Sequence, residues 1–264
     1  MAEIPVFRIN TERMKKDKFV AIATQLGLRG EPLATEEALF IHDKQRALAY
    51  AMPGSRFAGL LYFADSSQAI AAPSGRVPAG KAVEGWTDAL FKRFQLLPRP
   101  SEDKKVQVSF ASRALRRDSL VEEGQKAVKI SRVPLATDIV YDVRVNDHHV
   151  TGPRAKVRLT FKNSKGPAWI HRGLWDRLDV FEMRPLFSED QVYRRLSEQL
   201  SARGGSRKSW RLIDMRLAYF AGEFCGGPDL LRPYYFAEVE FRDPKDEARD
   251  RQGPRRLIPM PASG

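Results

Sequence analysis

Basic and apolar side chains alternate between positions 154 and 162, which is the pattern with the clearest chemical consequence in this chain. Val157, Leu159 and Phe161 take every second position, so a strand here would turn its cations away from the core. We take five residues as a partner-binding set: Arg144, Arg154, Lys156, Arg158 and Lys162. The first of them belongs to the preceding strand. A cationic sheet face of this kind attracts anionic partners or is simply solvated.

The histidines are the residues that would serve a metal centre or a general base. His148 and His149 are adjacent, and neighbouring strand residues point to opposite faces, so they do not share one metal unless the turn bends. Neither an H-x-x-x-H nor an H-E-x-x-H spacing occurs, and we expect turn histidines without a partner. An enzyme built from His149, His171 and a carboxylate stays an alternative, which requires a pocket where these groups converge.

For three further groups of candidate catalytic residues or motifs, we expect no chemical role. Glu238 and Glu240 share a strand face roughly 7 Å apart, which suits acid–base work but is also typical of a solvated face, and we expect the latter. Cys225 is the only cysteine, has no base nearby in sequence and is expected to be a spectator. The phosphate loop, the dinucleotide fingerprint and the G-x-S-x-G elbow do not occur, so we expect no cofactor.

The composition is that of a globular protein with a basic surface. The 264 residues carry a formal charge of +12, with 42% apolar and 30% charged residues. This excess favours nucleic acid, an acidic protein or an anionic membrane surface, although the basic residues are spread through the chain. A single cysteine indicates a reducing compartment. No run approaches 18 apolar residues and Met1 to Asn10 lacks the features of a signal peptide, so we expect a cytoplasmic protein without a transmembrane segment.

Amphipathic helices and alternating strands must position these residues. The apolar spacing predicts helices over 12–26 and 83–97, and a third that begins at the S-x-x-Q capping box of Ser188. Alternation predicts strands at 6–9, 38–42, 47–52, 59–63, 106–110, 139–145, 157–161, 213–219, 235–241 and 257–261, the last at a sheet edge. Arg113 to Lys129 is expected to be a loop or a short helix, and Asp65 to Lys81 a linker.

A helix followed by alternating strands occurs twice, at an offset of about 105 residues. We therefore predict an α+β fold made of tandem modules, each with one helix packed on antiparallel β-sheet. The modules would be 1–75, which is a degenerate copy, 76–187 and 188–264.

The segment VTGPRAKVRLTFKNSKGPAWIHRGLWDRLDVFEMRPLFSEDQVYRRL, Val150 to Leu196, resembles the PepSY-type modules and the related domains of the YycI and YpeB proteins. It has a hairpin strand, a glycine-containing turn, a tryptophan and a proline before the next helix. The resemblance implies a non-enzymatic binding or regulatory role.

The sequence predicts a binding protein that recognises an acidic protein or peptide through the basic sheet face or through an exposed edge strand. The alternative is a nucleic-acid-binding protein that uses the same surface. Against it, Tyr141 and Phe161 fall in the apolar phase of their strands and are expected in the core, where they cannot stack on bases.

Overall fold

The computed structural model describes residues 2–44, 46–51, 59–64, 76–123, 129–173, 175–203, 209–222, 230–242 and 254–263. Its helices are α1 (Lys16–Gln25), α2 (Gly80–Phe94), α3 (Glu189–Arg203) and the short 3-10 helix η2 (Pro153–Ala155). Its strands are β1 (Glu3–Asn10), β2 (Leu33–Ala34), β3 (Ala38–Asp43), β4 (Arg46–Ala51), β5 (Gly59–Phe63), β6 (Val108–Glu123), β7 (Lys129–Val145), β8 (His148–Thr151), β9 (Val157–Phe161), β10 (Trp169–Arg172), β11 (Arg177–Pro185), β12 (Ser209–Phe220), β13 (Leu230–Arg242) and β14 (Arg255–Pro261).

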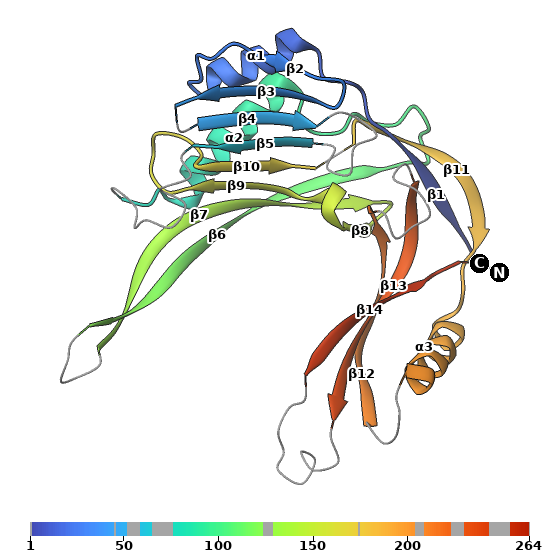
Figure 1. The fold of residues 1–264 in the computed structure, drawn as a ribbon. Helices are drawn as coiled ribbons and strands as arrows, with labels where there is room; N and C mark the ends of the chain where they lie inside the picture. Colours follow the sequence, from blue (N-terminus) through green and yellow to red (C-terminus); the bar gives the residue numbers. More distant parts are fainter. Residues whose placement is uncertain are drawn as a thin grey trace.

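These fourteen strands form one sheet. The order along it is β11-β1-β13-β12-β8-β7-β9-β10-β5-β4-β3-β2, with β14 added beside β13 and β6 beside β7. The pairs are antiparallel except β8 and β12, which run parallel. Figure 1 shows a curved body from which two arms project: the β6–β7 hairpin, and β12 to β14 together with α3. No helix in the described ranges is long and apolar enough to cross a membrane.

The expected tandem helix-plus-sheet modules are wrong, because strands from all three predicted segments pair with one another. β1 lies between β11 and β13, β5 pairs with β10, and β8 pairs with β12. Alternation of apolar residues tells which face of a strand is buried, but it says nothing about which strand lies beside it. The division at residues 75 and 187 stays a prediction about independent folding.

The larger core lies between the sheet and helices α1 and α2. Phe19 and Ile22 of α1 are fully buried in it, and Phe91 of α2 stacks on Tyr141 of β7 with ring centroids 5.2 Å apart. Trp86 meets the ring of Phe161 edge-on at 5.6 Å. The prediction that Tyr141 and Phe161 belong to the core is therefore confirmed. Both helices pack on the same face of the sheet.

A second core forms where α3 packs on β13 and β14. Val192 and Leu196 are fully buried against Val239, Met260 and their neighbours. The predicted capping box is confirmed: the Ser188 amide donates to Gln191 Oε1 at 2.9 Å, and the Gln191 amide donates to Ser188 Oγ at 3.3 Å. The helix therefore begins where two of its otherwise unsatisfied amides gain partners.

Residues 113–123 are not the expected loop or short helix. They belong to β6, which pairs with β7 from Val108 with Val145 out to Glu123 with Lys129, and residues 124–128 of the predicted segment lie outside the described residues. Ladder hydrogen bonds hold this ribbon, so its outer half forms without the apolar alternation that would have predicted it. Most of the predicted linker, at residues 65–75, lies outside the described residues.

Replacing Ser188→Ala removes one half of the capping box, and we expect the free energy of unfolding to fall by about 1 kcal/mol. Urea denaturation followed by circular dichroism measures this loss. Ser197→Ala, in the interior of the same helix, is the matched control and should be neutral or slightly stabilising because alanine favours the helix. Equal losses in the two variants would contradict the capping role.

Candidate functional site

The face of the sheet opposite α1 and α2 is open. On strands β3, β4, β5, β10, β9 and β7 the residues that alternate with the core point to this side, and no described element packs over them. We call this surface the open face. It runs in register from Phe40 through Ala49, Leu61, His171 and Arg158 to Val140, a width of about 24 Å across six strands.

A buried carboxylate fixes two arginines on the open face. The side chain of Asp138 on β7 is only 3% exposed. Its Oδ2 lies 2.7 Å from Nε of Arg117 and 2.6 Å from Nη2 of Arg158, and its Oδ1 accepts from Thr160 Oγ1 at 2.6 Å. Two positive charges thus flank one negative charge. Because the arginines lie over the carboxylate while their side chains remain 45% and 37% exposed, they present a net positive charge in a fixed geometry.

Aromatic rings lie beside these arginines. Trp169 on β10 sits under the guanidinium of Arg158, with Cζ 5.7 Å from the ring centroid, and against the imidazole of His171 at 5.9 Å. Phe63 on β5 is paired in register with Trp169 and is 46% exposed. Burial, followed by the charge of Lys156, lowers the pKa of His171, which favours the neutral ring. Further along, Phe40 and His42 stack nearly parallel with centroids 6.4 Å apart.

The structure brings together two of the five residues predicted to bind a partner. Arg158 and the exposed Lys156 share the open face beside His171. Arg144 has the same strand phase but lies further along β7, away from Arg158, where it contacts Asp142 and His149. Lys162 lines a different cavity, at the turn between β9 and β10.

Arg154 does not belong to the exposed face. It is 7% exposed and lies in η2, where its amide donates to the carbonyl of Ala221. The strand phase that the sequence suggests starts only at Val157, after this 3-10 turn. Burial leaves Arg154 little surface with which to steer a partner.

The histidines do not converge. His149 of β8 has its Nδ1 2.8 Å from Asp142 Oδ1 of β7, whereas His171 lies on β10, which β7 and β9 separate from β8. His148 packs edge-on against Tyr219. No three histidine, cysteine or acidic residues within the described ranges are placed to hold a metal ion. The enzyme site that combines His149 with His171 is therefore not formed.

The prediction that Glu238 and Glu240 form a solvated pair is wrong. Glu240 is fully buried and meets Arg211, which is paired with it on β12, at 3.3 Å. Glu238 binds Arg255 of β14 at 3.2 Å. Arginines on the two neighbouring strands thus neutralise both carboxylates, a relation that only the strand pairing reveals. Cys225 lies outside the described residues.

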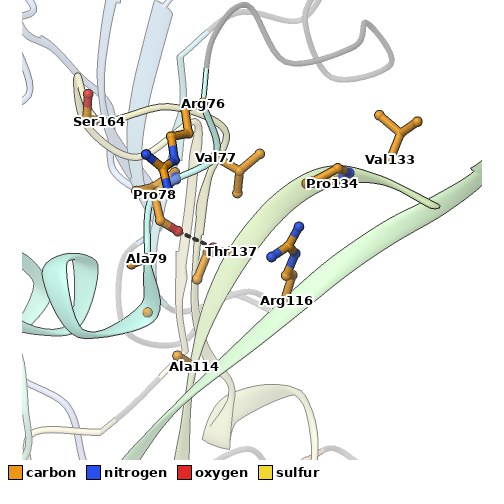
Figure 2. A pocket seen from close by; sticks show the side chains of 11 residues that line it. Arg76, Val77, Pro78, Ala79, Ala114, Arg116, Val133, Pro134, Thr137 and Ser164 are labelled. Carbon is orange, nitrogen blue, oxygen red and sulfur yellow. Dashed lines mark hydrogen bonds between the residues drawn. The ribbon is translucent and has the colours of Figure 1, made fainter.

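A cavity of about 1110 Å³ lies at the root of the β6–β7 hairpin near the start of α2 (Figure 2). Arg76 and Arg116 reach into it, and Thr137 donates a hydrogen bond to the carbonyl of Pro78 at 2.7 Å. Arg116 is paired with Asp118 at 3.0 Å. The described residues that line it include neither a histidine nor a carboxylate, so this part of the cavity offers room for a ligand but no general base.

Sequence reasoning missed the aromatic members of the open face, although a signal for them exists. A hairpin's register follows from its turn. Counting outward from the bridge between Asn163 and Gly166 places Trp169 opposite Thr160 and His171 opposite Arg158. Phe63 could not be found in this way, because β5 joins β10 from a distant part of the sequence.

Comparison with known proteins places the fold and no more. No family model and no curated protein match the chain, so the resemblance to PepSY-type modules stays a prediction. Among solved structures, the chain is similar to an uncharacterized protein from Eubacterium rectale ATCC 33656, with a TM-score of 0.53 and 9% identity. The match covers 98% of this chain and 82% of that chain. At this identity the likeness shows a shared fold alone.

Replacing Asp138→Asn leaves Arg117 and Arg158 without their charge partner, and we expect a loss of about 2 kcal/mol in the free energy of unfolding. This is below the full cost of stranding a buried ion, because both arginines reach water. Asp142→Asn, on the same strand and face but 42% exposed, should lose under about 1 kcal/mol. Urea denaturation of the two variants measures both losses. A larger loss in Asp142→Asn than in Asp138→Asn would contradict the role of Asp138 as the charge partner of the two arginines.

Proposed function

We propose that this protein binds single-stranded nucleic acid on the open face. The observation that carries the proposal is the joint placement of Trp169, Arg158 and Phe63, which sets a partly buried ring beneath a guanidinium and beside a second, exposed ring. Such a platform can stack one or two bases while its cations meet the adjoining phosphates. The formal charge of +12 adds a general attraction for polyanions.

The arrangement of charges supports an extended anionic ligand. Arg113 of β6 and Lys156, which precedes β9, are exposed on either side of β7, the strand that carries Asp138. Asp138 itself is covered and neutralised by two arginines. Toward solvent, this part of the open face therefore presents cations on β6 and β9, with the rings of Trp169 and Phe63 beside them on β10 and β5. A strand of nucleotides carries the complementary features, phosphates and bases, side by side.

An acidic protein or peptide, which the sequence predicts, is the second candidate partner. It would engage the same arginines and lysine, but it would gain little from Trp169 and Phe63. Its other mode, addition to an edge strand, is served poorly by β14, where Pro259 and Pro261 remove two backbone donors. The rings are thus the feature that separates the two candidates.

A cytoplasmic location, which rests on the single cysteine, is part of the proposal.

Fluorescence anisotropy with a labelled oligothymidylate tests the platform. In the double variant Phe63→Leu/Trp169→Leu we expect affinity to fall about 10- to 100-fold, since stacking contributes roughly 1–3 kcal/mol per base. Phe63→Leu alone alters an exposed side chain, keeps the fold and should show part of the loss. The matched control is Phe181→Leu on β11, which is also exposed and also lies under an arginine, but away from the open face.

The charged residues are tested by the dependence of affinity on salt. Arg113→Gln/Lys156→Gln should reduce the slope of log affinity against log salt by about two, because each substitution removes one cation that neutralises a phosphate. If the ring variants bind oligothymidylate as the wild type does, nucleic-acid binding on this face is refuted. If they also retain binding to a poly-glutamate peptide that the charge variant loses, the acidic partner takes its place.

A further inference from the structure

A separate cavity of about 160 Å³ lies on the helix side of the sheet, where α1 begins and α2 ends. Its lining carries an unusual concentration of charge. The cationic members are Arg13, Lys15, Lys18, Arg99 and Arg172, and the acidic ones are Glu12 and Asp176. The hydroxyl of Tyr50 closes one side by donating to the carbonyl of Glu12 at 2.9 Å.

Arg172 holds the base of this cavity in place. The residue is 3% exposed, and its Nε donates to the carbonyl of Leu96, just beyond the end of α2, at 2.6 Å. Its Nη2 lies 3.5 Å from the carboxylate of Asp176. The guanidinium therefore binds the chain just after α2 and the carboxylate of Asp176. It also places a permanent positive charge deep beside the cavity.

The carboxylates do not balance the cations that remain. Glu12 pairs with Arg99 at 3.0 Å on the exposed rim, and Asp176 pairs with Arg172. Within the described ranges, Arg13, Lys15 and Lys18 form no ion pair. The carbonyls at the end of α2 offset only part of this excess, since Lys18 Nζ reaches the carbonyl of Gln95 at a long 3.4 Å.

The start of α1 adds to the positive potential. Lys15 occupies the N-cap position, and no side chain caps the first turn. The first helical hydrogen bond that is made runs from the Phe19 amide to the Lys15 carbonyl, so the amides before it point out of the helix end. Lys15 and Lys18, from this turn, both line the cavity. The cations of this turn thus meet Arg172 and Arg99 at one cavity, which is an arrangement that favours an anion.

Lys18 responds to this crowding. Burial, followed by the charge of Arg172, lowers the pKa of its ammonium group, and the opposite effects of Asp176 and Glu12 do not cancel the shift. An anion in the cavity would raise the pKa of Lys18 again. By linkage, a site of this kind holds an anion more tightly when Lys18 is protonated, so affinity must fall as the pH rises through the lowered pKa of Lys18.

We propose that this cavity binds an oxyanion of the size of a phosphate group. The volume equals that of about five water molecules, which admits a phosphate group but not a whole nucleotide. Lys18 and Lys15 would hold its oxygens, with Arg172 supplying charge from below. The site is separate from the open face, because Arg172 alternates with His171 and points to the helix side of β10.

Isothermal titration of the full chain with inorganic phosphate tests the site, and a nucleoside 5′-monophosphate in a parallel titration shows whether the phosphate is preferred free or attached. We expect a Kd of about 1 mM or tighter for at least one of them. Lys18→Met keeps the apolar stem and should weaken binding about tenfold, since a charge-assisted hydrogen bond is lost. The wild-type affinity should also fall between neutral and alkaline pH.

Lys16→Met is the matched control, because it removes the same charge from the same helical turn at an exposed position outside the cavity. It should bind phosphate as the wild type does. Saturable binding of neither probe, or equal weakening in the two lysine variants, would overturn the proposal. Phe63→Leu/Trp169→Leu should leave phosphate binding intact, so failure at this cavity and failure at the open face are distinguished.

Discussion

Backbone pairing of β1 joins the two cores of the molecule. This strand lies between β11 and β13, and it pairs with β11 over its whole length, from Glu3 to Asn10. Phe7 is fully buried against the ring of Tyr219 on β12, with centroids 5.1 Å apart. The hydroxyl of Tyr219 donates to the carbonyl of Pro5 at 3.0 Å. Each ladder hydrogen bond contributes only about 1 kcal/mol. Together they fix the α3 arm relative to the body.

The open face follows from how the apolar residues are distributed. Helices α1 and α2 both pack on the same side of the sheet, and the apolar phase of β3 to β5, β7, β9 and β10 is directed to them. The opposite phase is left with rings, cations and small residues. Without the buried carboxylate of Asp138, Arg117 and Arg158 would be mobile surface side chains. With Asp138 in place, the two arginines are ordered before a ligand binds, and Arg158 is held close to Trp169. Binding a ligand therefore costs less side-chain entropy.

Local features of the fold could be predicted from the sequence. The apolar spacing gave helix α1, the capping box gave the first residues of α3, and alternation assigned Tyr141 and Phe161 to the core. Each of these depends on residues within a few positions of one another. The strands predicted at 106–110 and 139–145 are the inner part of the β6–β7 hairpin, and its outer part was missed because it lacks apolar alternation.

Pairing between distant strands could not be predicted, and most of the candidate site depends on it. Phe63 meets Trp169 only because β5 joins β10, and Glu240 is buried only because Arg211 faces it from β12. Of the predicted binding residues, Arg158 and Lys156 lie on the open face because their strand phase was read correctly. Arg154 is buried because a 3-10 turn precedes that strand.

Photocrosslinking tests the account most directly. An oligonucleotide carrying 4-thiothymidine at successive positions would be irradiated on the full chain, and the attached peptides identified by mass spectrometry. The account predicts adducts on Phe63 of β5 and on Trp169 or His171 of β10. Adducts confined to α1, α2 or the α3 arm, with none on β5 or β10, would contradict it.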